Sequence, residues 1–210
     1  LEQLSGALVQ DSVAMIGGTK FRAQGTTLIT HNGVSGPCIL RLSSYAARYL
    51  AEHGYTAPLV MNWLGESSEN EAMDLLHTMA MENAQKLVCN THPQQLTSRH
   101  WEFLVSRAGI GRDVRWSGVG RKQMNRLASV LTSDMYQITG RVPHKEEFVT
   151  AGGVSLHSVE SNTLECKTRP GLYFAGEVLD VDGVTGGFNL QAAWTMADTV
   201  ARAVANRFNE

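Results

Sequence analysis

Residues 171–194 constrain the fold more than any other part of this 210-residue chain. Residues 172–175 form a short apolar and aromatic run beside glycines, which is typical of a strand buried on both faces. A glycine-rich loop follows, and from Leu190 to Phe208 apolar residues recur at steps of three and four. That spacing predicts a helix of about five turns. The stretch is therefore expected to fold as a strand, a loop and a helix.

Two glycines, Gly186 and Gly187, precede this helix in place of larger side chains. The first N–H groups of a helix have no intrahelical partner and carry partial positive charge. Glycine lets a flat, electron-rich ligand approach these donors directly. The residues expected around such a ligand are Gly186, Gly187, Phe188, Asn189 and Leu190. The alternative is a loop that only makes room for a neighbouring strand.

The same stretch carries a family resemblance. Residues 172–183, Leu-Tyr-Phe-Ala-Gly-Glu-Val-Leu-Asp-Val-Asp-Gly, and residues 186–191, Gly-Gly-Phe-Asn-Leu-Gln, resemble the C-terminal FAD-binding signature of the YhiN/BaiN-type (aminoacetone-oxidase-like) flavoproteins. Residues 149–154, Val-Thr-Ala-Gly-Gly-Val, and residues 30–37, Thr-His-Asn-Gly-Val-Ser-Gly-Pro, agree in order and spacing. One departure is Phe188, where the family usually has tyrosine.

The resemblance implies an α+β fold in two parts. Residues 1–148 are expected to form a mixed insert domain, a β-barrel-like layer with a helical subdomain, on the substrate side. Residues 149–210 are expected to form the C-terminal part of a glutathione-reductase-like FAD-binding α/β domain. The order of elements favours the same division, because strands come first, three helices follow, and strands return before the motif-bearing end.

Periodicity predicts the individual elements. A capping box formed by Ser68 and Glu71 marks the start of one helix, and proline at residue 37 suits the start of another. The predicted strands are residues 8–15, 26–30, 58–64, 135–141 and 147–150, and the predicted helices are residues 37–52, 68–88, 95–108 and 121–131.

The resemblance also assigns roles to residues outside the helix start. Thr150, Gly152 and Gly153 match the family loop that passes close to the isoalloxazine ring, and the alternative is an ordinary hairpin turn. Gly176 and Glu177 follow the strand at residues 172–175, and by resemblance Glu177 accepts hydrogen bonds near the FAD ribityl chain or pyrophosphate. The alternative for Glu177 is a solvated loop acid or a cap for a nearby N–H group.

Catalytic residues are not identified by any motif, and His31 is the one candidate. Its pKa in water is near neutral, and the resemblance places it on the insert side that faces the flavin domain. The alternative is a plain contact between domains. Asp180 and Asp182 fall short of a calcium-loop ligand set, so no metal site is expected. Cys166 has no Cys-x-x-Cys partner that would form a redox disulfide.

Composition bounds the partners and the compartment. The net charge is −2, and the absence of a basic surplus predicts no nucleic-acid partner. No apolar run of about 20 residues is present, which predicts no membrane association. The three cysteines are odd in number and widely spaced, which favours free thiols in a reducing compartment, the cytoplasm by default.

The chain opens on Leu1, and no Gly-x-Gly-x-x-Gly turn lies at a strand-to-helix junction. We therefore expect a C-terminal fragment of a longer flavoprotein, whose missing N-terminal half supplies the remaining FAD contacts. On its own, the chain is expected to be inactive and free of FAD. It is also expected to self-associate through residues 172–175 and 190–208.

Two functions from different classes remain open. In the first, the parent protein is an FAD-dependent oxidoreductase that moves a hydride between flavin and a small organic substrate or NAD(P)H. In the second, the chain is a non-catalytic interaction module that no longer binds flavin.

Overall fold

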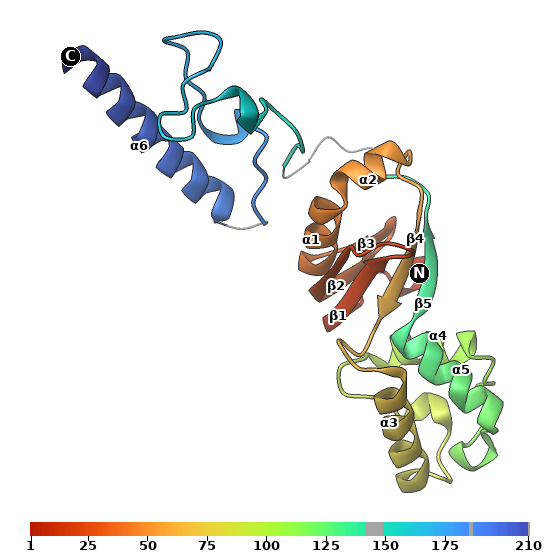
Figure 1. Ribbon diagram of the computed structural model, residues 1–210. Coiled ribbons are helices and arrows are strands. Elements are labelled where there is room, and N and C mark those ends of the chain that lie inside the picture. The colour runs from red at the N-terminus through yellow and green to blue at the C-terminus, as the bar shows by residue number, and fades with distance from the viewer. Residues whose placement is uncertain (142–148, 185–186, 210) are drawn as a thin grey trace. The chain divides into compact units, whose positions relative to one another are not determined.

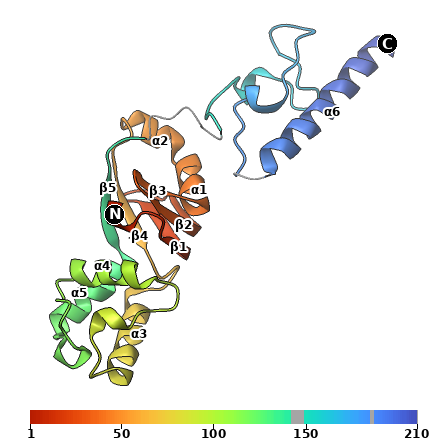
Figure 2. The same ribbon diagram turned by 180° about the vertical axis from the view of Figure 1, so that it is seen from behind.

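The computed structural model describes residues 1–141, 149–184 and 187–209. Backbone contacts divide the chain into two compact units, residues 1–142 and 143–210. Each unit is described by itself (Figures 1 and 2). The expected domain boundary between residues 148 and 149 lies near this division and stays a prediction.

The first unit is built on a curled antiparallel sheet of five strands in the order β3-β2-β1-β4-β5 (Figure 1). Between Val9 and Ser12 the pairing of β1 with β2 shifts register, and such a bulge increases the local twist. The predicted strands are present, whereas β3 was not predicted because three residues give too little alternation. The strands are β1 (Leu8–Ile16), β2 (Arg22–Thr30), β3 (Gly33–Ser35), β4 (Ala57–Asn62) and β5 (Asp134–Ile138), after a short turn η1 (Glu2–Leu4).

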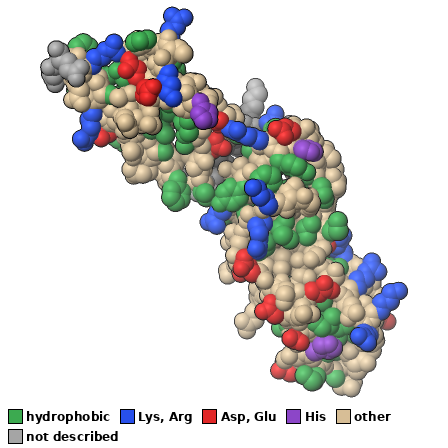
Figure 3. Space-filling model, viewed as in Figure 1, with side chains coloured by type: hydrophobic (Ala, Val, Ile, Leu, Met, Phe, Trp, Pro, Cys, Tyr) green, Lys and Arg blue, Asp and Glu red, His purple; other side chains and the backbone are tan. Residues whose placement is uncertain are grey.

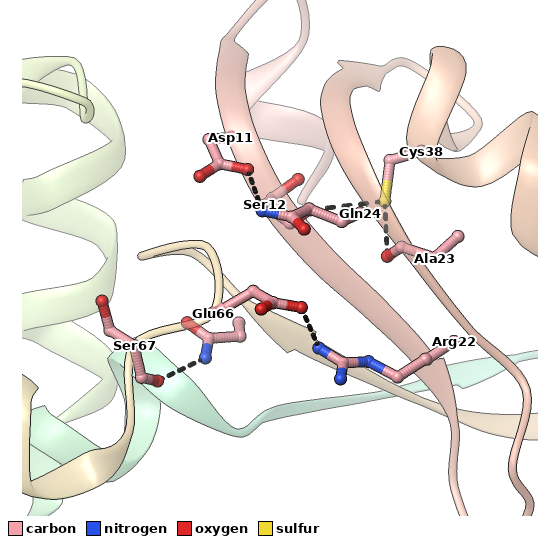
Figure 4. A network of polar contacts seen from close by, with 9 residues as sticks. Asp11, Ser12, Arg22, Ala23, Gln24, Cys38, Glu66 and Ser67 are labelled. Carbon is pink, nitrogen blue, oxygen red and sulfur yellow. Dashed lines mark hydrogen bonds and ion pairs between the residues drawn. The ribbon is translucent and has the colours of Figure 1, made fainter.

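Two helices, α1 (Pro37–Tyr45) and α2 (Ala47–Glu52), follow β3, and α1 packs on β1 and β2. The buried Cys38 thiol of α1 donates to the Ala23 carbonyl of β2 at 3.2 Å (Figure 4). A single helix over residues 37–52 was predicted, but the chain bends at the fully buried Ala46. The apolar spacing continues through this bend, so periodicity does not reveal it.

Exposed polar side chains join β2 to the loop after β4 and to β1 (Figure 4). Arg22 donates to Glu66 at 2.9 Å, and Gln24 donates to Asp11 at 2.9 Å. Such exposed pairs contribute little to stability, so the sheet depends mainly on its buried face.

A helical subdomain is inserted between β4 and β5. It consists of α3 (Glu69–Glu82), η2 (Val88–Asn90), α4 (Ser98–Arg107), η3 (Trp116–Gly118) and α5 (Arg121–Thr132). The predicted capping box is present, because Ser68 Oγ accepts the Glu71 N–H and Glu71 Oε2 accepts the Ser68 N–H. Helix α3 ends earlier than predicted because the backbone and side-chain N–H groups of Asn83 both donate to the Met79 carbonyl. One continuous apolar core runs through the sheet and these helices.

Asp134, at the start of β5, joins the sheet to the helices. Its side chain is 1 % exposed. Trp63 Nε1 donates to Oδ2 at 3.0 Å, and Arg107 donates to Oδ1 through Nε at 2.9 Å and Nη2 at 2.6 Å. The Tyr136 hydroxyl also donates to Oδ2. Burial, reinforced by this carboxylate, raises the pKa of Tyr136, so the hydroxyl keeps its proton.

The second unit contains η4 (Leu156–Ser158), η5 (Gly176–Val178) and α6 (Phe188–Asn209). Helix α6 confirms the predicted C-terminal helix. Among the described residues of this unit, only Val159 and Leu179 are buried. Its backbone pairing consists of isolated bridges, so the unit has little core of its own.

The strand predicted at residues 172–175 is wrong for this structure. Leu172 is 45 % exposed, and Tyr173 forms only a single bridge with Glu165. An apolar run forms a strand only when neighbouring backbone is available to pair with it. The described residues of this unit offer residues 172–175 a single bridge, from Glu165 to Tyr173. Of the strand predicted at residues 147–150, residues 147 and 148 lie outside the described residues, and Val149 and Thr150 have no regular structure.

Replacing the Asp134 carboxylate will test its role as the joint of the first unit. Asp134→Ala leaves the donors on Trp63, Tyr136 and Arg107 without their acceptor, so we expect a loss of about 3 kcal/mol in the free energy of unfolding. Urea unfolding followed by tryptophan fluorescence measures this loss. Glu66→Ala, which removes an exposed ion pair with Arg22, is the control and is expected to change stability by less than about 1 kcal/mol. Equal effects of the two substitutions would contradict this role.

His100 in α4 is fully buried, and neither ring nitrogen has a hydrogen-bond partner among the residues that the structure describes. Its ring meets Trp63 edge-on, with centroids 4.6 Å apart. Burial lowers the pKa of His100 to about 4, so the imidazole is neutral in the folded chain.

This burial predicts a pH dependence of stability. In the unfolded chain His100 becomes protonated below about pH 6.5, whereas in the folded chain it stays neutral down to about pH 4. The free energy of unfolding therefore falls as the pH drops from about 6.5 to about 4. His100→Phe is expected to reduce that loss by on the order of 2 kcal/mol. Urea unfolding at neutral and acidic pH measures it, with the exposed His77→Gln as control. An identical pH dependence in wild type and His100→Phe would refute the assignment.

Candidate functional site

The second unit brings together three of the segments predicted to bind a cofactor. The loop before Val154 lies beside the segment after η5, because the Val154 N–H donates to the Val178 carbonyl at 2.8 Å and the Asp180 N–H donates to the Val154 carbonyl at 2.9 Å. These bonds form a parallel bridge between Val154 and the buried Leu179. The loop and η5 are therefore held at a fixed register.

Gly153 is required at this bridge by close packing. Its φ is +152°, and a Cβ atom there would lie 2.6 Å from the Val178 carbonyl oxygen. Gly152 has a φ of +106°, but no described atom lies within 4 Å of its Cβ position. Gly152 and the exposed Thr150 thus leave space for a ligand, whereas Gly153 contacts the protein's own backbone.

Helix α6 holds η5 in place. The Gly176 N–H donates to Met196 Sδ at 3.3 Å, and the Gly176 Cβ position is 3.6 Å from Ala193. Gly176 has a φ of +77°, which favours glycine. Glu177 is exposed and makes no hydrogen bond or ion pair with the described residues, so its carboxylate is free to accept bonds from a ligand.

The start of α6 is open. No described atom lies within 4 Å of the Gly187 Cβ position, and its φ lies outside the left-handed region. Phe188 is 66 % exposed and Leu190 is 69 % exposed. Asn189 Oδ1 accepts the Gly183 N–H at 2.6 Å and thereby fastens the preceding loop to the helix. Gly186 lies outside the described residues.

The electrostatics at this end suit an electron-rich group. In helical geometry the N–H groups at the start of α6 have no intrahelical acceptor, and they lie at the positive end of a helix of 22 residues. An open glycine at a helix start, N–H donors without an intrahelical acceptor and an exposed carboxylate in the same unit fit a planar ring that carries polar edges. The residues present therefore fit the flavin that the resemblance implies.

His31 lies in the first unit, in the turn between β2 and β3. Its Nδ1 is 3.3 Å from Glu2 Oε1, and both side chains are exposed. This local contact accounts for the position of the ring and supplies no evidence for catalysis.

Sequence reasoning missed the residues that hold α6 at its other end. Glu165 Oε1 accepts the Gly171 N–H at 2.5 Å and Arg207 Nη1 at 2.7 Å. The Gly171 N–H, and then Arg207, hold the pKa of Glu165 below its usual range. Glu165 and Arg207 are far apart in sequence, so no local pattern predicts their pairing. The contact of Asn189 with Gly183 has a local signal, because Asn side chains often accept backbone N–H groups near a helix start.

No helix among the described residues is both long and apolar enough to cross a bilayer. In the same part of the chain, no three His, Cys, Asp or Glu side chains gather closely enough to hold a metal ion.

The comparisons with known proteins agree with the resemblance. A family model described as "HI0933-like protein barrel and H2TH domain" matches residues 1–149. The ribosomal RNA dihydrouridine synthase of Escherichia coli is 32 % identical over 206 residues, which cover 94 % of this chain and 46 % of that protein. The enzyme of the same name from Haemophilus influenzae is 28 % identical, over 99 % of this chain and 48 % of that protein.

A third relative has a different name. The 3-dehydro-bile acid delta(4,6)-reductase of Clostridium scindens is 28 % identical, over 97 % of this chain and 50 % of that protein. The chain spans about half the length of the curated relatives it matches.

The expectation of no nucleic-acid partner is wrong, because two of these relatives are named as enzymes of ribosomal RNA. That expectation used the net charge of −2. Net charge does not report how charges are distributed over a surface, and a local basic face is compatible with an acidic total.

The two neighbouring glycines provide a matched test of the bridge. Both Gly152→Ala and Gly153→Ala place a side chain at positive φ, but only Gly153→Ala drives Cβ into the Val178 carbonyl. We expect Gly153→Ala to open the bridge, so that the Val154 and Asp180 amides exchange with deuterium at least about tenfold faster, which corresponds to about 1.4 kcal/mol. Mass-spectrometric hydrogen exchange on both variants measures this. Slower or unchanged exchange in Gly153→Ala relative to Gly152→Ala would contradict the packing explanation.

Proposed function

Because this chain belongs to the HI0933-like family, the YhiN/BaiN-type flavoproteins, we propose that it forms part of an FAD-dependent oxidoreductase. The observation that supports this proposal most is the open start of α6 at Gly187, in the same unit as the uncrowded Gly152 and the exposed carboxylate of Glu177. A bound flavin supplies hydride transfer, and the protein supplies orientation and electrostatics.

Each part of the site has a distinct task in this proposal. The N–H groups after Gly187 donate to the pyrimidine edge of the ring and stabilise negative charge there. Gly152 leaves room for the ring face, and Glu177 accepts hydrogen bonds from ribityl hydroxyl groups. Asn189 and Gly153 position these groups through their contacts with Gly183 and Val178.

The names of the relatives suggest the reaction class. A dihydrouridine synthase and a delta(4,6)-reductase both imply the addition of two hydrogens across a carbon–carbon double bond. We propose the same class of reaction here: one hydride reaches one carbon from NAD(P)H by way of the flavin, and one proton reaches its neighbour. A uracil base of ribosomal RNA is the first candidate substrate, because two relatives carry that name. A small unsaturated ketone, suggested by the bile acid reductase, is the second.

We further propose that another segment of a longer protein completes the cofactor site. The chain spans about half of its relatives' length. On α6, Trp194 is 76 % exposed and Phe208 is 84 % exposed, and an apolar surface of this kind suits a packing partner. Self-association through α6 is a competing use of the same surface. A module that binds no flavin is the alternative function.

Gly187→Val in the full-length protein separates the flavoprotein from the non-binding module. The side chain meets no described atom, so the fold is expected to persist while flavin loses access to the N–H donors. The expected result is at least about a tenfold drop in flavin absorbance per chain, at unchanged far-ultraviolet circular dichroism.

The matched control is Gly120→Val, at the corresponding N-cap position of α5 in the first unit. Its Cβ position is also uncrowded, with Gln123 Oε1 at 3.9 Å. Flavin content of this variant is expected to equal that of wild type. Wild-type flavin content in Gly187→Val, or a colourless full-length wild-type protein, would favour the non-binding module.

A further inference from the structure

The helical subdomain of the first unit is electrostatically polarised. Residues 66–85, which include α3, contain five Asp and Glu and no Lys or Arg. Residues 107–126, which lead into α5, contain six Lys and Arg and one Asp. In Figure 3 the blue side chains gather along the edge where Figure 1 shows α5, and red side chains gather toward α3. A chain with a net charge of −2 thus carries a strongly basic local face.

Three exposed cations on α5 have no partner among the described residues. Arg121, Lys122 and Arg126 are exposed and make no hydrogen bond or ion pair with the residues that the structure describes. The opposite side of the helix is buried through Leu127 and Leu131. These cations therefore point toward solvent and are available to a ligand.

Their position in the helix argues against a stabilising role. Arg121 and Lys122 are the first two residues of α5, and the first turn contains no acidic residue. Cations at the start of a helix interact unfavourably with the helix dipole. By contrast, α3 follows the stabilising pattern, with Glu69 and Glu71 in its first turn.

Two more cations are brought together before α5. The bridge between Leu87 and Arg115 places Arg115 beside Lys86, whose carbonyl accepts the Trp116 N–H at 3.1 Å. Lys86 is exposed, and Arg115 uses one guanidinium N–H to bind the Gln85 carbonyl at 3.0 Å. The basic face of α5 consists of Arg121, Lys122 and Arg126, and Lys86 and Arg115 form a second pair of cations in the same subdomain.

Other arginines of the subdomain are less available. Arg99, Arg107 and Arg112 line a cavity of about 680 Å³ beside α4. Arg99 donates to the Ser5 carbonyl at 2.9 Å, Arg107 pairs with Asp134, and Arg112 pairs with Glu102. Because their donors are already engaged inside the protein, this cavity is the weaker candidate for an anionic ligand.

We propose that the basic face of α5 binds the phosphate backbone of an RNA substrate, an inference that rests on the proposed action on ribosomal RNA. Lys122 and Arg126 are four residues apart and therefore lie on one side of the helix, about 6 Å apart along its axis, with Arg121 in the first turn. Guanidinium groups bind phosphate through paired N–H donors, and Lys adds a point charge. Such contacts hold the RNA without reading its sequence.

The test is a charge-removing triple variant, Arg121→Gln, Lys122→Gln and Arg126→Gln, in the full-length protein. The probe is a fluorescein-labelled RNA hairpin with uridines in its loop, and fluorescence anisotropy across a salt series gives the affinity. The variant is expected to bind at least about tenfold more weakly at physiological salt. The slope of log affinity against log salt is expected to fall in magnitude by about 2.

A charge-matched control removes three positive charges elsewhere in the first unit: Lys20→Gln before β2, Arg22→Gln in β2 and Arg41→Gln in α1, all exposed in the structure. It is expected to bind RNA within about threefold of wild type. A charge-retaining double variant, Arg121→Lys and Arg126→Lys, is expected to do the same. Any of three results would overturn the proposal. The control could lose as much RNA affinity as the triple variant, the triple variant could keep wild-type affinity, or the charge-retaining variant could lose as much affinity as the triple variant.

Flavin absorbance of every variant separates this inference from the proposed function. The triple variant is expected to keep wild-type flavin content, because its substitutions lie outside the cofactor site. A wild-type protein that holds flavin but binds no RNA would overturn the RNA surface and leave the flavoprotein proposal standing. Flavin loss in Gly187→Val with normal RNA binding would support both.

Discussion

The first unit depends on one buried carboxylate. Asp134 accepts hydrogen bonds from Trp63, directly after β4, from Arg107 of α4 and from Tyr136 of β5. A desolvated charge is tolerated only when its lone pairs are satisfied, so these donors must be in place before the strand can close the sheet. The helical insertion between β4 and β5 is therefore required for β5 to pair, and the sheet and the helices share one core.

The second unit, in contrast to the first, has few buried contacts among its described residues. Its site segments are held by individual hydrogen bonds, such as those of Asn189 with Gly183 and Glu165 with Arg207, over a core of two buried residues among those described. The site is therefore defined by backbone register more than by side-chain packing. This arrangement explains why the motifs at residues 149–154 and 172–191 are recognisable in sequence. Glycines at fixed positions determine the backbone conformation there, and few large side chains are involved.

The sequence predicted the elements that local pattern controls. The Ser68 capping box, the apolar stripe of α6 and the strands β1 and β2 follow from nearby residues. It did not predict the bend at Ala46, where apolar spacing continues, or the exposure of residues 172–175, whose strand propensity needs neighbours to pair with. Among site residues, the close packing of Gly153 against the Val178 backbone was not predicted, because it depends on a segment distant in sequence.

The unequal charges of α3 and α5 have a consequence for encounter as well as for affinity. These two helices pack against each other, so an acidic and a basic outer surface lie on one small subdomain. A polyanion that approaches at random is repelled from the first and attracted to the second, which rotates the partners toward one orientation before contact. If the subdomain binds RNA as proposed, this charge distribution favours one direction of approach and raises the association rate, an effect that salt weakens.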